Sequence, residues 1–109
     1  MITLDILDGP ARGRRFSLTR RQVIIGRDET CTLQIPDERI SRRHLRIAYD
    51  PRTDRHVAVD VGSSNGVTVN GARLVRGTER ILREGDEICL GLSRLRYTRC
   101  EPSSQDARA

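Results

Sequence analysis

Apolar and polar positions alternate in short runs along most of the chain. Residues 2–6 alternate strictly, the valines of 57–61 recur at every second position, and turn residues such as those at 8–10 and 50–51 interrupt the runs about every 8 to 12 positions. Successive side chains of a β-strand point to opposite faces, so this alternation is typical of strands. No run has the 3.6-residue spacing of an amphipathic helix. The pattern therefore predicts an all-β sandwich or barrel.

Each predicted strand is a short apolar run between turn residues. We expect strands at residues 2–6, 16–18, 23–25, 33–35, 45–49, 57–61, 67–69, 80–82, 87–90 and 94–98. The dipeptide Asn70-Gly71 is the strongest two-residue hairpin signal in the chain, because such a turn needs positive φ angles that these residues tolerate. The total is about ten or eleven strands, without substantial helix.

A chain of 109 residues has room for one domain. We expect the domain at residues 1–100 and a disordered polar C-terminal tail at 101–109. No apolar run reaches the roughly 20 residues of a membrane-spanning helix, and the first residues do not resemble a secretory signal. Three cysteines without a Cys-x-x-Cys pair argue against a disulfide scaffold and a zinc ribbon. The expected location is cytoplasmic, without membrane contact.

The basic charge consists entirely of arginine. Twenty arginines against 15 acidic residues give a net charge of +5, and six arginines lie between positions 39 and 55. This excess either reflects codon usage or indicates an anionic partner, since guanidinium groups bind phosphate oxygens bidentately. Only 3% of residues are aromatic, whereas binders of single-stranded nucleic acid usually add stacking aromatics to their charge. Phosphate binding is favoured over base recognition.

Three residue clusters follow the predicted strands in loops, where binding residues concentrate. They are Gly26-Arg27, Ser41-Arg42-Arg43-His44 and the run 60–71. Each alone is equally explained by turns and local hydrogen bonds. Residues 62–66 fit the letters of a nucleophile elbow, but a strand follows where that elbow needs a helix. Ser41 and His44 lack a third partner, and the histidines and cysteines lack metal-ligand spacing, so we expect no catalysis, cofactor or metal.

In combination the clusters are specific. The order Gly-Arg, Ser-x-x-His, Ser-Asn-Gly and Val-Asn-Gly resembles the forkhead-associated (FHA) domain, over residues 1–100. The resemblance implies an eleven-stranded, antiparallel-type β-sandwich (FHA/SMAD-like) whose loops at one end bind phosphothreonine peptides. Val67 and Ser64 stand where many members carry threonine; Ser64 still supplies a hydroxyl.

A phosphothreonine dianion needs several convergent donors, at least one of them cationic. The resemblance implies that the phosphate or its neighbouring backbone is contacted by Arg27, Ser41, Arg42 and Ser64, and that Asn65 fixes the peptide. It also implies loop-shaping roles, without ligand contact, for Gly26, His44, Gly66, Asn70 and Gly71. Arg43 is expected to face solvent.

The sequence thus predicts a non-enzymatic, phosphothreonine-dependent adaptor in Ser/Thr kinase signalling. Its expected partner is a phosphothreonine-containing protein or peptide, with no specific nucleic acid, and a monomer is expected. One alternative is an FHA-like module that binds a partner protein independently of phosphate. The other is a small basic nucleic-acid-binding β-protein, whose binding depends strongly on salt.

Overall fold

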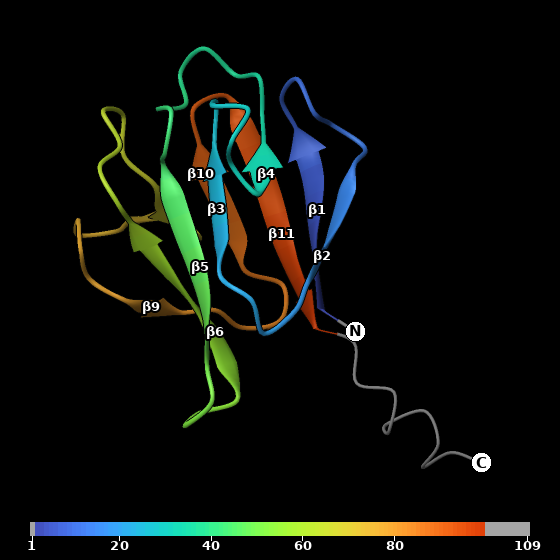
Figure 1. The fold of residues 1–109 in the computed structure, drawn as a ribbon, viewed down its shortest axis with the longest axis vertical. Helices are drawn as coiled ribbons and strands as arrows, with labels where there is room; N and C mark the ends of the chain where they lie inside the picture. Colours follow the sequence, from blue (N-terminus) through green and yellow to red (C-terminus); the bar gives the residue numbers. More distant parts are fainter. Residues whose placement is uncertain (1, 100–109) are drawn as a thin grey trace.

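The computed structural model describes residues 2–99, which form eleven strands in two sheets and no helix (Figure 1). The six-stranded sheet has the order β2 (Arg15–Leu18), β1 (Ile2–Asp8), β11 (Ser93–Arg99), β10 (Glu87–Leu90), β7 (Thr68–Val69) and β8 (Ala72–Arg73). The five-stranded sheet has the order β4 (Leu33–Gln34), β3 (Val23–Gly26), β5 (Leu45–Asp50), β6 (Arg55–Asp60) and β9 (Arg80–Ile81). The predicted all-β sandwich is confirmed.

Strand pairing is antiparallel except between β3 and β4, where Ile25 pairs with Leu33 in parallel. Every predicted strand is present, with ends that differ by one or two residues for most. Val61, predicted to end a strand, lies in the loop after β6 and is 39% exposed. The predicted tail at 101–109 lies outside the described residues, so its disorder stays a prediction.

The hydrophobic core lies between the sheets. Tyr97, Leu4, Ile25 and Leu95 are completely buried there. On β6 the residue that joins this core is Ala58, whereas the flanking Val57 and Val59 are also buried but lie outside the main cluster. The valine row of the predicted strand therefore belongs to the other face of the sheet.

The predicted hairpin at Asn70-Gly71 joins β7 to β8. Both residues have positive φ, 52° and 84°, as a type I′ turn requires. The Asn70 side chain also donates to Asp86 Oδ1 (2.8 Å) and accepts from the Glu87 backbone N–H (2.9 Å). Asn70 and Gly71 thus fix this hairpin against the start of β10.

The loops that carry the predicted site gather at one end of the sandwich. Figure 1 shows the β3–β4 and β4–β5 loops at the top, and the β5–β6 hairpin at the opposite end. Because β3 and β4 are parallel, both strands end at the same end of the sandwich, and the loops that follow them lie there together. The two sheets therefore serve as a rigid base for one set of loops.

Candidate functional site

The β3–β4 loop is joined to the β4–β5 loop by main-chain hydrogen bonds. The Arg27 N–H donates to Ser41 O (3.1 Å) and the Asp28 N–H to Arg42 O (3.2 Å). Gly26 permits this close approach, because a Cβ at that position would lie 2.1 Å from Arg42 O. Any other residue at position 26 would push the loops apart.

The Arg27 side chain is exposed beside this junction. Its Nε donates to Ile40 O at 3.1 Å, which orients the guanidinium. That bond uses one of five N–H donors, so the two Nη groups remain available for a ligand. Within the described residues Arg27 forms no ion pair with an acidic side chain.

A serine hydroxyl connects the β4–β5 and β6–β7 loops. Ser41 Oγ accepts a hydrogen bond from the Ser64 N–H at 3.0 Å. Because that bond occupies a lone pair, the hydroxyl proton of Ser41 is still free to donate to an anion. Ser64 itself is exposed, so its hydroxyl lies at the surface of the same junction.

His44 is the buried brace of these loops. Its Nδ1 accepts from the Ser41 N–H and its Nε2 lies 2.9 Å from Gly66 O. Nδ1 must therefore be unprotonated and Nε2 must carry the hydrogen, which assigns the neutral tautomer. The ring is completely buried and so cannot contact a ligand. The two hydrogen bonds join the β4–β5 loop to the β6–β7 loop, and the supporting role of His44 in ligand binding stays a prediction.

The Asn65 amide lies across from the β4–β5 loop. Its Nδ2 donates to Arg39 O at 2.9 Å, and the residue is exposed. One amide hydrogen and the amide oxygen have no partner among residues 2–99. An amide with one donor and one acceptor left can hold a peptide backbone. Gly66 follows with a φ of +84°, which glycine adopts without strain.

Asp60, at the end of β6, shapes the loop that presents Asn65. Its carboxylate accepts from the N–H groups of Gly62 (3.0 Å) and Ser63 (2.9 Å) and from the Ser63 hydroxyl (2.6 Å). Burial by itself would raise the pKa of Asp60, but these hydrogen bonds outweigh it and lower the pKa from its usual value of 3.8. Sequence reasoning gave Asp60 no role, although it begins the third cluster.

Arg42 and Arg43 are both exposed. The Arg42 guanidinium lies 3.8 Å from the Asp28 carboxylate, which is at the limit of an ion pair. A hydrogen bond from the Thr30 N–H lowers the pKa of Asp28, and the charge of Arg42 lowers it further, although partial desolvation opposes both effects. This carboxylate is therefore ionised beside the site. Asp28 was not predicted, because its nearness to Arg42 arises only when the two loops meet.

The structure thus brings together five predicted ligand contacts and three predicted loop supports. These are Arg27, Ser41, Arg42, Ser64 and Asn65, with Gly26, His44 and Gly66 beneath them. Their contact with a ligand stays a prediction. Asn70 and Gly71 lie in the β7–β8 hairpin instead and support it. Another hollow, of about 570 Å³ around Arg55, Ile81 and Arg99, includes none of the predicted residues.

Comparison with known proteins identifies the family. The FHA domain model matches residues 23–91. FhaA, an FHA domain-containing protein of Mycobacterium tuberculosis, is 38% identical over 94 residues, which cover 86% of this chain and 16% of FhaA. The chain therefore spans about a sixth of that relative.

Solved structures agree. An FHA domain analysed for phosphothreonine-dependent interactions has a TM-score of 0.78 and 34% identity, covering 92% of this chain and 97% of its own. The FHA domain of FhaA, in complex with an intracellular domain of another protein, has a TM-score of 0.75 and 35% identity, covering 89% and 99%. This chain belongs to the FHA domain family, as its motifs indicated.

Two negative observations hold for the described part of the chain. Residues 2–99 contain no helix long and apolar enough to cross a membrane. They also contain no group of three or more histidine, cysteine, aspartate or glutamate side chains arranged to hold a metal ion.

Proposed function

We propose that this domain binds phosphothreonine-containing peptides at the loop end of the sandwich and acts as a non-catalytic adaptor in Ser/Thr kinase signalling. The observation that carries the proposal is the convergence of unused donors from three loops. The Arg27 Nη groups, the Ser41 hydroxyl proton and the Asn65 amide all come from residues already fixed by hydrogen bonds. Donors held in place before binding lose little conformational entropy when a ligand arrives.

A phosphothreonine peptide matches this arrangement in charge and in donor count. The phosphate carries about −1.5 to −2 charges and three acceptor oxygens. Arg27 and Arg42 supply the cations, Ser41 and Ser64 the hydroxyls, and Asn65 is placed to hold the adjoining peptide backbone. Both nitrogens of His44 are hydrogen-bonded to backbone groups, so this histidine is not available as a base for the Ser41 hydroxyl. This supports the proposal of a recognition module without catalysis.

The direct test compares phosphorylated and unphosphorylated forms of the same threonine peptides by fluorescence anisotropy. We expect micromolar affinity, about −8 kcal/mol, for the phosphothreonine form and no measurable binding for the other. Equal binding of both forms would favour a phosphate-independent module. Binding to unrelated oligonucleotides that matches the phosphopeptide at physiological salt would favour the nucleic-acid alternative.

A phosphoserine version of the best peptide tests selectivity. The resemblance to the family suggests a small pocket near Asn65 for the threonine methyl. Burying one methyl group contributes about 0.8 kcal/mol, so we expect a loss of at least about fourfold for phosphoserine. Equal affinity for the two phosphopeptides would show that no such pocket exists.

A further inference from the structure

Two hollows meet at strand β9, on a flank of the sandwich. The first has a volume of about 570 Å³ and includes Arg55, and the second has about 580 Å³ and includes Glu79. Ile81 and Arg83 line both hollows. None of the five predicted ligand contacts lines either one. The surface around β9 is therefore separate from the proposed phosphothreonine site.

Strand β9 is the last strand of its sheet, so one of its edges has no neighbouring strand. Its other edge is fixed to β6, where Ile81 pairs with Val57 and the Leu82 N–H donates to His56 O (2.9 Å). Successive residues of a strand direct their main-chain groups to opposite edges. Because the Leu82 N–H points toward β6, the N–H and C=O of Ile81 point toward the free edge.

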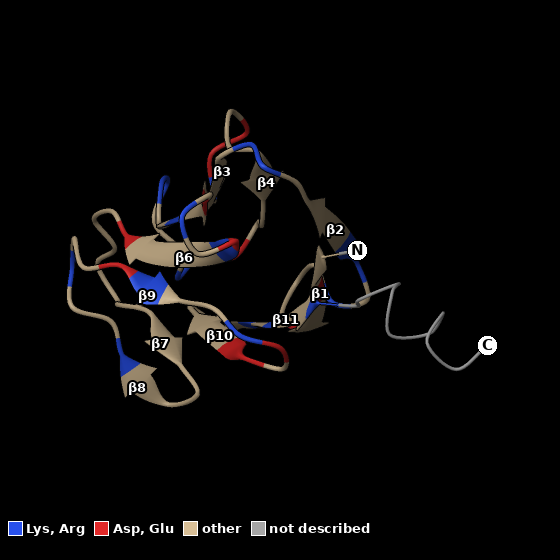
Figure 2. Cartoon of the chain, turned by 90° about the horizontal axis from the view of Figure 1, so that it is seen from below, with Lys and Arg blue, Asp and Glu red and all other residues tan. Residues whose placement is uncertain are grey.

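The second hollow lies along this free edge. Figure 2 shows β9 between β6 and the β7–β8 hairpin, and Asn70 of that hairpin lines the hollow together with Ile81. The volume of about 580 Å³ leaves room beside β9 for part of an extended segment. The apolar side chain of Ile81 is 40% exposed. Free main-chain groups next to an exposed apolar side chain favour the addition of a strand.

The first hollow is positively charged. It is lined by three arginines and one carboxylate: Arg55, Arg83, Arg99 and Glu84. Arg99 is paired with Asp54 at 2.8 Å. Arg55 and Arg83 are exposed, and among residues 2–99 no carboxylate lies within ion-pair distance of either. Exposed guanidinium groups without an acidic partner are available for a carboxylate brought by a ligand.

The charge changes sign along the edge. Arg83 follows Ile81 by two positions, Glu79 precedes it by two, and both are exposed. On an antiparallel strand whose central residue faces Ile81, the residue two positions earlier lies opposite Arg83 and the residue two positions later lies opposite Glu79. A carboxylate at the earlier position meets a cation, whereas one at the later position meets a like charge. The edge thus distinguishes the direction of an acidic strand.

We propose that β9 binds an extended acidic segment of a partner protein, which joins the sheet as an antiparallel strand. An apolar residue of the segment lies opposite Ile81 and exchanges both main-chain hydrogen bonds with it, as opposite residues of an antiparallel pair do. An aspartate or glutamate two positions earlier contacts Arg83 and Arg55. This site needs no phosphate and goes beyond the proposed function, because a partner can occupy it whether or not the loop end holds a phosphopeptide.

Heptapeptides of alternating threonine and valine test the proposal, since their valines share one face of an extended strand. Glutamate, or glutamine as the matched control, replaces the valine two positions before the central valine. Titrations followed by amide NMR spectra of the domain measure the affinities. We expect the glutamate peptide to bind about three- to fivefold more tightly, with the largest shifts at Ile81 and its neighbours. Glutamate two positions after the central valine should give no gain over glutamine, because it faces Glu79.

N-methylation of the peptide tests the strand itself. A methyl group on the nitrogen of the central valine removes the donor to Ile81 O and should weaken binding about tenfold or more. The matched control carries the methyl group on the next threonine, whose N–H points away from β9. This second peptide should lose less than about threefold.

Four variants locate the charge effect. Arg55→Gln and Arg83→Gln should each reduce the preference for glutamate over glutamine to less than about twofold. Arg76→Gln is the control, because Arg76 is exposed in the β8–β9 loop but lines neither hollow, and it should retain the full preference. Glu79→Gln should improve the peptide with glutamate after the central valine. Thermal unfolding of each variant checks that the fold is intact.

The proposal is wrong if glutamate and glutamine peptides bind equally, if the shifts lie away from β9, or if the preference survives in both Arg55→Gln and Arg83→Gln. Equal tolerance of the two N-methyl groups would mean an anion site without strand addition, and a gain only from the later glutamate would mean a parallel strand. Shifts at Ile81 that grow with protein concentration before peptide is added would assign the edge to a second copy of this chain. Each of these results overturns the proposal.

A phosphothreonine peptide separates this site from the loop end. At saturation it should leave the affinity of the glutamate heptapeptide unchanged within about twofold, because the two surfaces share no residue. If phosphothreonine peptides fail to bind while the heptapeptide results hold, the proposed function is wrong and the β9 site stands. Competition between the two peptides for one surface would show that β9 is not a separate site.

Discussion

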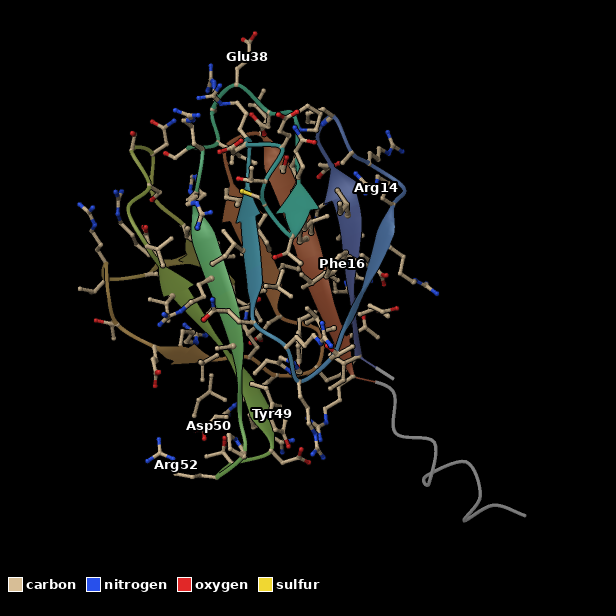
Figure 3. The ribbon with its side chains drawn as sticks, viewed as in Figure 1. Arg14, Phe16, Glu38, Tyr49, Asp50 and Arg52 are labelled. Carbon is tan, nitrogen blue, oxygen red and sulfur yellow. The ribbon has the colours of Figure 1, made fainter. Side chains whose placement is uncertain are left out.

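Arginines at the two ends of the sandwich are in opposite situations. At the β5–β6 end, Arg52 lies 3.3 Å from Asp50, and Arg99 lies 2.8 Å from Asp54, which also accepts from the Tyr49 hydroxyl (2.6 Å). Figure 3 shows Tyr49, Asp50 and Arg52 together at that end and Glu38 at the other. At the loop end, Arg27 has no acidic partner within the described residues, and Arg42 has only a distant one.

The difference shows how one residue type serves two purposes. Hydrogen bonds from Tyr49 and Arg99 lower the pKa of Asp54, so Arg99 is paired there with an ionised carboxylate. Exposed pairs of this kind contribute little to stability, but they make the paired guanidinium less available to a partner. The loop end has acidic residues too, among them Asp28 and Glu38, but within residues 2–99 no carboxylate lies within ion-pair distance of Arg27 or Arg43. The overall excess of +5 matters less than where the unpaired guanidiniums lie.

The largest expected effect comes from Arg27→Ala. Removing a cation from a partly desolvated contact costs about 2–5 kcal/mol of binding energy, or roughly 30- to several-thousand-fold in phosphopeptide affinity. Arg52→Ala at the opposite end should change affinity less than about twofold. Titration of both variants with one phosphothreonine peptide makes the measurement, and thermal unfolding should show both to be folded. Similar losses for the two variants would mean that charge acts at a distance and not through contact.

The two buried histidines give the next comparison. His44 joins Ser41 to Gly66, whereas His56 joins the Tyr97 hydroxyl (3.1 Å) to Thr19 O (2.8 Å) near the other end. Alanine at either position leaves a cavity and unpaired polar groups, so each should lower the free energy of unfolding by about 2–3 kcal/mol. Only His44→Ala should also weaken phosphopeptide binding at a temperature where both variants remain folded. If His56→Ala weakened binding equally, His44 would have no special place in the site.

The stability contributed by Asp60 gives a smaller effect, one that depends on pH. The pKa of Asp60 is lower in the folded chain than its usual 3.8, so its contribution to stability is present above about pH 4 and is lost as the pH falls through the folded value. Asp60→Asn should therefore cost about 1 kcal/mol of unfolding free energy at pH 7, and less near pH 3. Urea unfolding of the wild type and the variant at both pH values measures how the loss of unfolding free energy changes with pH.

A comparison of Asp60 with Asp54 separates loop shape from surface charge. Asp60→Asn should reduce phosphopeptide affinity at pH 7, because the β6–β7 loop loses hydrogen bonds that hold it. Asp54→Asn, at the far end, should leave affinity unchanged. A normal affinity for Asp60→Asn would show that the loop keeps its shape without an ionised carboxylate.

The smallest expected effect is a gain. Asp28 is ionised 3.8 Å from the Arg42 guanidinium and competes with an incoming phosphate for that cation. Asp28→Asn removes the carboxylate that pairs with the Arg42 guanidinium. Phosphopeptide affinity should therefore rise by about two- to fivefold at low salt and less at high salt. Titrations at two salt concentrations check it. A loss of affinity would instead show that Asp28 is needed to hold its loop.

Strands and turns could be predicted because local sequence determines them. Period-two alternation predicted the strands, and the dipeptide Asn70-Gly71 predicted the hairpin because both residues tolerate the positive φ angles that they have in the structure. The candidate site residues came from the resemblance of the motif order to the FHA family, and the structure brings them to one end of the sandwich; their contact with a ligand stays a prediction. His44 is buried and hydrogen-bonded on both sides, and its role as a support for ligand binding stays a prediction.

Contacts made through backbone carbonyls could not be predicted. Arg27 is oriented by Ile40 O and Asn65 by Arg39 O, and a carbonyl group is the same whatever its residue. The nearness of Asp28 to Arg42, and of Arg73 to Gly66, depends on loops and strands that meet only after folding. On β6, the alternation did not predict which face of the strand packs on the core. The inward positions hold Ala58 and the hydrogen-bonded His56, and the valines lie on the other face.

The carbonyl contacts have a consequence for how such a domain can diversify. Ile40, Arg39 and Gly66 serve the site through main-chain oxygens, so the frame places no demand on the chemistry of an exposed side chain such as that of Arg39. A substitution of that side chain should therefore leave the main-chain contacts that orient Arg27 and Asn65 unchanged. Specificity and fold are then separable traits. Libraries randomised at the exposed positions 38 and 39, on an otherwise constant scaffold, would test this separation of side-chain chemistry from fold.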